Sequence, residues 1–256
     1  MNRVGIVLSA INASPRSAIL LGVIGLSVPW LLEDYRRWLR LGKSALPPNP
    51  IGWLFAVSLK PFGRETLSTT EYTQDPNDAA WLDPAAIPER RGSRPFTGWH
   101  FAPHRQLDRI PDDLIRKELE AVFAKHAEAN QGVVEIYTSR HERLGDGMHL
   151  RSSVPAPHGP AIQAQLEMGH IHSQDASMHF MLSPRDCKLV IEQGWGERHP
   201  LSGVSNWIPM PKEYLLIYAP RNDEELAVIE HIMMASIGYM SNGQNAIESS
   251  MNQCES

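Results

Sequence analysis

Residues 167–182 read EMGHIHSQDASMHFML, and this stretch decides how the C-terminal half of the chain folds. Side chains of an extended segment alternate between two faces, so His170 and His172 of the H-x-H pattern point to the same face. A short turn follows, and residues 177–182 are predicted as a second strand, which carries His179. We therefore expect a sheet with several imidazoles on one face. Two carboxylates accompany them, from Glu167 and Asp175.

A later histidine, His199, stands in the segment GWGERHPLSG (194–203) and can join this cluster. Three interpretations fit four imidazoles and two carboxylates. An H-x-H pair with a distant histidine is a workable set of metal ligands. A histidine titrating near neutral pH is also a suitable general base without any metal. Histidines that only hydrogen-bond to the backbone are the third interpretation, and the spacing leaves all three open.

The pattern on either side predicts an α+β fold, with a small antiparallel or mixed sheet and helices packed on one face. Apolar positions three and four residues apart predict a helix over residues 111–130. Ser183 is a typical N-cap for a second helix that ends near Gln193. Asn222 caps a final helix with three acidic residues in its first turn. Further strands are expected at residues 133–139, 147–153 and 214–219.

Residues 17–32, SAILLGVIGLSVPWLL, carry no charge. As a helix they would extend about 24 Å, less than the ~30 Å hydrocarbon core of a bilayer. We expect a single-pass membrane anchor; a cleaved signal peptide and a buried soluble helix are the alternatives. Basic residues favour a body that faces the cytosol. Two precede the run (Arg3 and Arg16) and four follow it (Arg36, Arg37, Arg40 and Lys43).

Composition limits the remaining classes of function. The 256-residue chain has a net charge of −5, which argues against nucleic acid as a partner. Its two cysteines cannot build a disulfide framework. The apolar run 51–59 is too short to span a bilayer and is expected to be a helix at the membrane surface or docked on the core. We divide the chain into a membrane anchor with this helix (1–60), an α+β domain (61–241) and a polar tail (242–256).

Several segments together resemble the fungal luciferase family. The histidine-rich stretch is followed by GWGERHPLSG (194–203), by YAPRNDEEL (218–226) and by ASIGYMSN (235–242). The likeness continues upstream in RRGSRP (90–95) and in the hydrophobic N-terminal helix with arginines after it. It covers residues 85–110 and 165–242 most clearly. The resemblance implies a membrane-associated enzyme that oxygenates 3-hydroxyhispidin, a styryl-pyrone, with O2 as co-substrate.

The resemblance also implies chemistry without metal or flavin, because an electron-rich enolate can itself reduce O2. The protein must then supply a base, a donor-lined pocket and a dry cavity. The base would be one of His170, His172, His179 and His199, with Glu167 and Asp175 nearby. A metal-dependent enzyme that uses the same histidines, and a non-catalytic small-molecule-binding membrane protein, are the alternatives.

Four further residues are candidates for binding the substrate in this scheme. Arg198 and Arg221 could hold the pyrone oxygens, and Trp195 and Tyr218 could stack on the flat aromatic arm. Each has a structural alternative: Trp195 between two glycines as a packing residue, Arg198 in an internal salt bridge with Glu197 or Asp175, and Arg221 as a tie at the helix start.

Overall fold

A single antiparallel sheet organises the chain in the computed structural model, which describes residues 15–77 and 79–244. The strand order is β1-β2-β3-β4-β6-β5, and each neighbouring pair is antiparallel. The predicted α+β class is therefore confirmed, with the antiparallel form of the sheet. The strands are β1 (Val134–Thr138), β2 (Asp146–Leu150), β3 (Glu167–Ile171), β4 (Met178–Met181), β5 (Gly196–Arg198) and β6 (Tyr214–Ile217).

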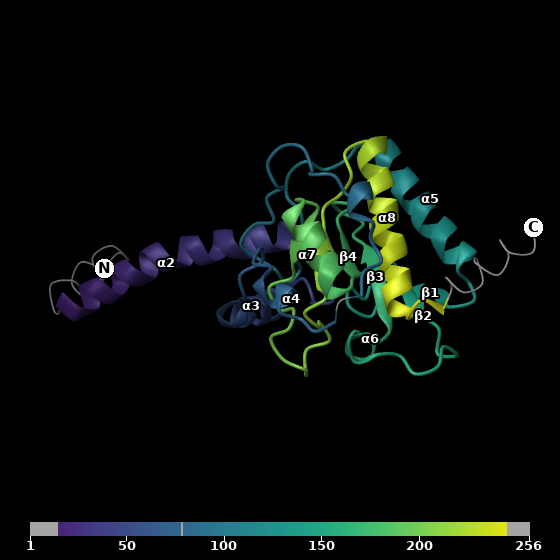
Figure 1. Ribbon diagram of the computed structural model, residues 1–256. Helices are drawn as coiled ribbons and strands as arrows, with labels where there is room; N and C mark the ends of the chain where they lie inside the picture. The colour runs from purple at the N-terminus through teal and green to yellow at the C-terminus, as the bar shows by residue number, and fades with distance from the viewer. Residues whose placement is uncertain (1–14, 78, 245–256) are drawn as a thin grey trace, which may run out of the picture.

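Three helices cover one face of this sheet: α5 (Asp113–Ala129), α7 (Pro184–Glu192) and α8 (Asp223–Met240). In Figure 1, α5 and α8 lie side by side. Each helix begins at an N-cap residue whose side-chain oxygen accepts a hydrogen bond from a free backbone N–H of the first turn, and the sequence predicts two of these caps, Ser183 and Asn222. The three caps are Asp112, Ser183 and Asn222.

The strands divide their side chains between the helix-covered face and the opposite face. Met178 and Phe180 of β4 join the apolar core under the helices, so His179 between them points to the other face. His179 pairs with His170 of β3. The register shifts between Met148 and His149, where β2 meets β3. Such a bulge changes which side chains share a face, and it brings Glu167 to the side of His170.

The N-terminal region covers the histidine-bearing face. Its elements are α2 (Pro15–Arg40), α3 (Pro50–Leu59) and the short helix η1 (Lys60–Phe62). The indole of Trp38 donates to the carbonyl oxygen of Ala102 at 2.8 Å, and that of Trp53 donates to Asp34 at 2.9 Å. Figure 1 shows the N-terminal part of α2 projecting away from the body. The smaller helices are α4 (Thr70–Thr73), η2 (Pro84–Ala86) and α6 (Gly159–Gln163).

The N-terminal membrane helix is the part of the predicted fold that the structure does not confirm. Residues 17–32 lie within α2, a continuous helix with Pro29 inside it. Among the described residues, no helix combines the length and the apolar character needed to cross a bilayer. The predicted polar tail at 242–256 falls mostly outside the described residues, as does Arg3 among the flanking charges.

Candidate functional site

A cavity of about 170 Å³ lies on the face of the sheet that the helices leave free. Its floor is formed by side chains of β3, β4 and β6, and its walls by α3, by residues 101–105 and by residues 141–142. Apolar side chains from α3 and the loops dominate the wall. They are Leu46, Phe55, Leu59, Phe101, Leu201 and Met210.

The four predicted histidines lie close together, and three of them, His170, His179 and His199, line this cavity. The ring centroids of His170 and His172 lie 5.1 Å apart, those of His172 and His179 4.9 Å, and those of His179 and His199 5.4 Å. This cluster does not lie beneath the final helix, α8. Helix α8 packs on the opposite face, because the residues that alternate with His179 are the ones in its core.

The hydrogen bonds of three imidazoles define their tautomers. His170 Nδ1 lies 2.6 Å from the Glu167 carboxylate, and His179 Nδ1 lies 3.0 Å from the carbonyl oxygen of Leu215. Both partners accept only, so Nδ1 carries the proton. His172 Nδ1 lies 2.9 Å from the Ser177 hydroxyl, whose proton is donated to Asp175. That hydroxyl must therefore accept from His172, so the neutral form of each of the three rings has its lone pair at Nε2.

Burial sets the charge of this cluster. Loss of hydration lowers the pKa of His172 and of His179 well below the usual range, and the neighbouring cationic groups lower it further. Burial also raises the pKa of Asp175. Burial alone would raise the pKa of Glu167. The hydrogen bond and the electrostatic attraction from His170 outweigh burial, so the pKa of Glu167 is lowered. Near neutral pH the imidazoles of His172 and His179 are thus neutral, and Glu167 is ionised.

The sequence analysis missed two further histidines, His104 and His141, which line the same cavity. His104 Nε2 lies 3.0 Å from the Glu197 carboxylate, which also accepts from the Tyr218 hydroxyl at 2.8 Å and from Thr97 Oγ1 at 3.0 Å. Nε2 therefore carries the proton. The lone pair at Nδ1 is buried and has no hydrogen-bond partner in the described part of the chain. A lone pair held in this way suits a proton acceptor.

Arg105 is another cavity residue that the sequence did not indicate. It is 2% exposed, it pairs with the Glu142 carboxylate, and its guanidinium also donates to the carbonyl oxygen of Lys43. Its Nε–H is buried without a hydrogen-bond partner among the described residues. This donor is available to an oxygen atom of a bound molecule. Both Arg105 and His104 lie in an irregular segment without periodicity, so no pattern could have singled them out.

The four proposed substrate-binding residues do not line the cavity. Arg198 lies on the other face of β5 from Glu197, where it bonds to Tyr72 and pairs with Glu71. Trp195 is buried and donates to the carbonyl oxygen of Pro88. Arg221 pairs with Glu225 at the start of α8. Tyr218 reaches the site only through Glu197. These contacts match the structural alternatives more closely, although the partner of Arg198 is Glu71.

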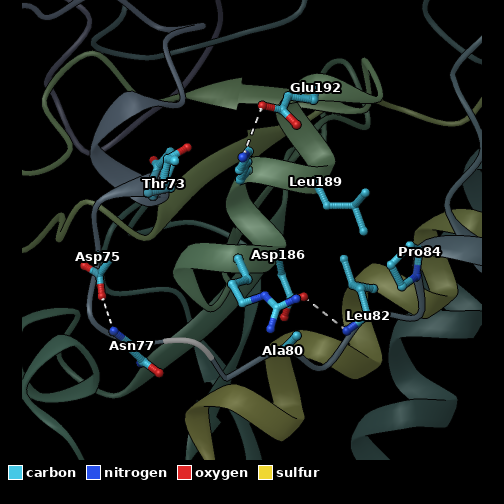
Figure 2. A pocket seen from close by; sticks show the side chains of 12 residues that line it. Thr73, Asp75, Asn77, Ala80, Leu82, Pro84, Asp186, Leu189 and Glu192 are labelled. Carbon is cyan, nitrogen blue, oxygen red and sulfur yellow. Dashed lines mark hydrogen bonds and ion pairs between the residues drawn. The ribbon is translucent and has the colours of Figure 1, made fainter.

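Another pocket, of about 440 Å³, lies between α4, α7 and the segment before η2 (Figure 2). Its carboxylates already have partners. Asp186 accepts from the backbone N–H groups of Trp81 and Leu82, and Glu192 pairs with Lys188. None of its described lining residues is a histidine. The cavity with unpartnered nitrogen atoms is therefore the better candidate for a functional site.

Comparison with known proteins places this geometry in a family. The family model described as Luciferase domain matches residues 165–236, which include the histidine-bearing strands. The luciferase of Armillaria ostoyae is 35% identical over 227 residues, which cover 85% of this chain and 84% of that protein. The luciferase of Neonothopanus nambi is 33% identical over 242 residues, covering 88% of each chain. The chain belongs to the fungal luciferase family. No solved structure matches it.

Proposed function

We propose that the protein is a luciferase-like oxygenase that joins O2 to an enolisable hydroxy-pyrone, such as 3-hydroxyhispidin, or to a related phenol. The family membership supports an oxygenase of this kind. The observation that carries the proposal is His104, which lines a mostly apolar cavity: Glu197 holds its Nε2, and its Nδ1 has no hydrogen-bond partner among the described residues.

His104 takes the enol proton of the substrate at Nδ1, and the resulting enolate oxygen lies against the Nε–H of Arg105. The enolate carbon forms a bond to O2, whose reduction by the enolate electron pair gives a peroxide. The peroxide closes on the lactone carbonyl, the proton returns from His104 to oxygen, and one CO2 leaves. The apolar wall keeps water from this intermediate.

The test is O2 uptake by the purified full-length protein with 3-hydroxyhispidin. We expect equimolar consumption of O2 and pyrone, with release of one CO2 for each pyrone, and light recorded in the same cuvette. Folded protein that binds the pyrone without consuming O2 would be a non-catalytic binder, and the proposal would fall.

A second candidate is a metal-dependent oxygenase that uses the same cavity. The family resemblance implies chemistry without a metal, and that expectation stays a prediction. The three Nε2 lone pairs of His170, His172 and His179 favour the alternative, since a metal ion needs ligand atoms of this kind.

We also propose that the protein associates with a lipid bilayer. Helix α3 is apolar along its whole length, and Ile51 and Leu54 are 75% and 57% exposed. Trp30 on α2 is exposed as well. Such surfaces are typical of helices that lie in the membrane interface. Phe55 and Leu59 of the same helix line the cavity, so a substrate dissolved in the bilayer would enter beside α3. An anchor at residues 17–32, with the body in the cytosol, remains part of this proposal.

A further inference from the structure

We propose that His170, His172 and His179 bind a single divalent transition-metal ion through their Nε2 atoms. The inference goes beyond the proposed oxygenation and departs from the metal-free chemistry that the family resemblance implies. It adopts the alternative that the histidine spacing left open.

The position of the three rings is the first support. Each offers one ring nitrogen, and these nitrogens all lie within 4.8 Å of one another. Three ligands of one metal at bonds of about 2.0–2.1 Å must lie within such a distance of each other. The rings come from β3, from the residue after it and from β4, so the sheet register holds them in place.

Unpartnered nitrogen atoms are the second support. The Nε2 atoms of His170 and His172 are fully buried, and neither has a hydrogen-bond partner within the ranges that the structure describes. Both residues are 1% exposed. A buried polar atom without a partner costs free energy, and a metal ion that uses the lone pair removes this cost.

The groups behind the rings are the third support. Metal-binding histidines generally donate their other N–H to a carboxylate, a carbonyl or a bound polar group, which fixes the ring and makes the ligand nitrogen more basic. Here Glu167 accepts from His170, the Leu215 carbonyl oxygen accepts from His179, and Ser177 links His172 to Asp175. The Nδ1 atoms of all three rings are held in this way.

A second group, His104, His179 and His199, also brings ring nitrogens within 4.8 Å, but it fits a metal less well. The backbone N–H of Leu201 donates to His199 Nδ1 at 3.0 Å, so the proton of that ring is at Nε2. The Nε2–H in turn bonds to the backbone of Phe101. His199 therefore has no lone pair to offer in its present orientation.

The ligand set indicates which ions fit. Three neutral imidazoles suit Zn²⁺, Fe²⁺ or Co²⁺, and they leave a position open for water or substrate. That position faces the cavity, since His170 and His179 both line it. A carboxylate oxygen of Glu142 lies 4.0 Å from His172 Nε2, so a fourth protein ligand is within reach if Glu142 leaves Arg105.

The test is a titration of the purified full-length protein, stripped of metal by a chelator, with Co²⁺ while its visible absorption bands are recorded. We expect a single Co²⁺ per chain, displaced by Zn²⁺. Glu167→Gln should weaken binding by about 10–100-fold, and His172→Ala by more. His199→Gln and the exposed control His231→Ala should bind as the wild type does. Zn²⁺ should raise the melting temperature of the wild type but not that of His172→Ala.

Folded wild-type protein that binds no Co²⁺ would overturn the proposal, and this outcome is measured on the wild-type protein alone. So would loss of binding in His199→Gln with retention in His172→Ala. The readout is separate from oxygenation: O2 uptake by metal-free protein would leave the proposed function standing, and Co²⁺ binding by a protein without O2 uptake would leave the metal site standing.

Discussion

His104 illustrates how a single hydrogen bond assigns chemistry to a side chain. Glu197 accepts the proton of Nε2, so the lone pair of the neutral ring is fixed at Nδ1. His199 has the same tautomer, but the backbone N–H of Leu201 donates to its Nδ1 and so occupies the lone pair. Two histidines whose ring centroids lie 5.1 Å apart therefore have different capabilities.

Replacement of His104 tests its role as the base. We expect His104→Ala to lower the rate of pyrone oxidation by about 10²–10⁴-fold, the usual contribution of a general base. Glu197→Gln should cost less, because the imidazole remains. Stopped-flow O2 consumption measures both, with His231→Ala as the control. A rate within twofold of the wild type in His104→Ala would remove this residue from the reaction.

Glu213 gives the protein a pH-dependent stability. Burial raises its pKa from an ordinary value of 4.5 to about 7. Between these two values the unfolded chain has released the proton and the folded one has kept it, so the free energy of unfolding falls as pH rises. At 1.36 kcal/mol per pH unit the loss amounts to about 3 kcal/mol at most.

Glu213→Gln should therefore be more stable than the wild type at pH 8 and no more stable at pH 4.5. Urea unfolding at a series of pH values measures the difference, and comparison of the two proteins cancels the titration of the buried histidines. A stability difference that does not change with pH would contradict a raised pKa.

The residues of the site could be predicted only where they stand in a regular pattern. The H-x-H spacing brought His170, His172 and His179 together correctly, because alternation along a strand is a property of the backbone. The sequence analysis assigned Arg198 to the site, but in the structure it is the neighbouring residue, Glu197, that faces the site. A shift of one residue in register exchanges the two faces of a strand, and the short segment GER gives no alternation from which to read it.

At the scale of elements, the pairing of β3 with β4 depends on Gly169. A Cβ atom there would collide with the carbonyl oxygen of His179 and with the ring of Phe180. Gly169→Ala should cost about 1–3 kcal/mol of stability, as overpacking in a core does. Gly132→Ala is the matched control, because nothing lies within 4 Å of its added Cβ. Thermal unfolding distinguishes the two variants, and equal melting temperatures would contradict the clash expected at residue 169.

Helix α3 carries the proposed contact with the bilayer. Burial of one exposed Ile or Leu side chain contributes about 1.5–3 kcal/mol. The double change Ile51→Ser and Leu54→Ser should therefore weaken binding to phosphatidylcholine vesicles by at least tenfold. Neither side chain is among those lining the cavity, so oxidation of a water-dissolved substrate should continue. Vesicle flotation measures the binding, and unchanged flotation would remove α3 from the membrane contact.

Helices were easier to predict than strands. The N-caps Ser183 and Asn222 marked two helix starts to within a residue, since a cap is a local interaction. The three-residue strand β5 was not anticipated. It exists through its pairing with β6, and a partner distant in sequence leaves no local signal.

At the scale of the whole molecule, the two faces of the sheet have different roles. Its helix-covered face holds most of the apolar core, while its other face presents histidines to a cavity closed by the N-terminal region. Side-chain periodicity indicated an α+β fold with helices on one face. It could not show that α2, α3 and residues 96–110 cover the opposite face, because that packing is made between segments far apart in sequence.

The location of the site is the central claim, and obstruction of the cavity tests it most directly. Ala45 lines the histidine cavity, whereas Ala80 lines the pocket of Figure 2. We measure kcat/KM for O2 consumption with 3-hydroxyhispidin in Ala45→Trp and in Ala80→Trp. The value should fall at least tenfold in Ala45→Trp and stay at the wild-type level in Ala80→Trp. Normal turnover in a folded Ala45→Trp, with loss in Ala80→Trp, would contradict the assignment of the active site to the histidine face.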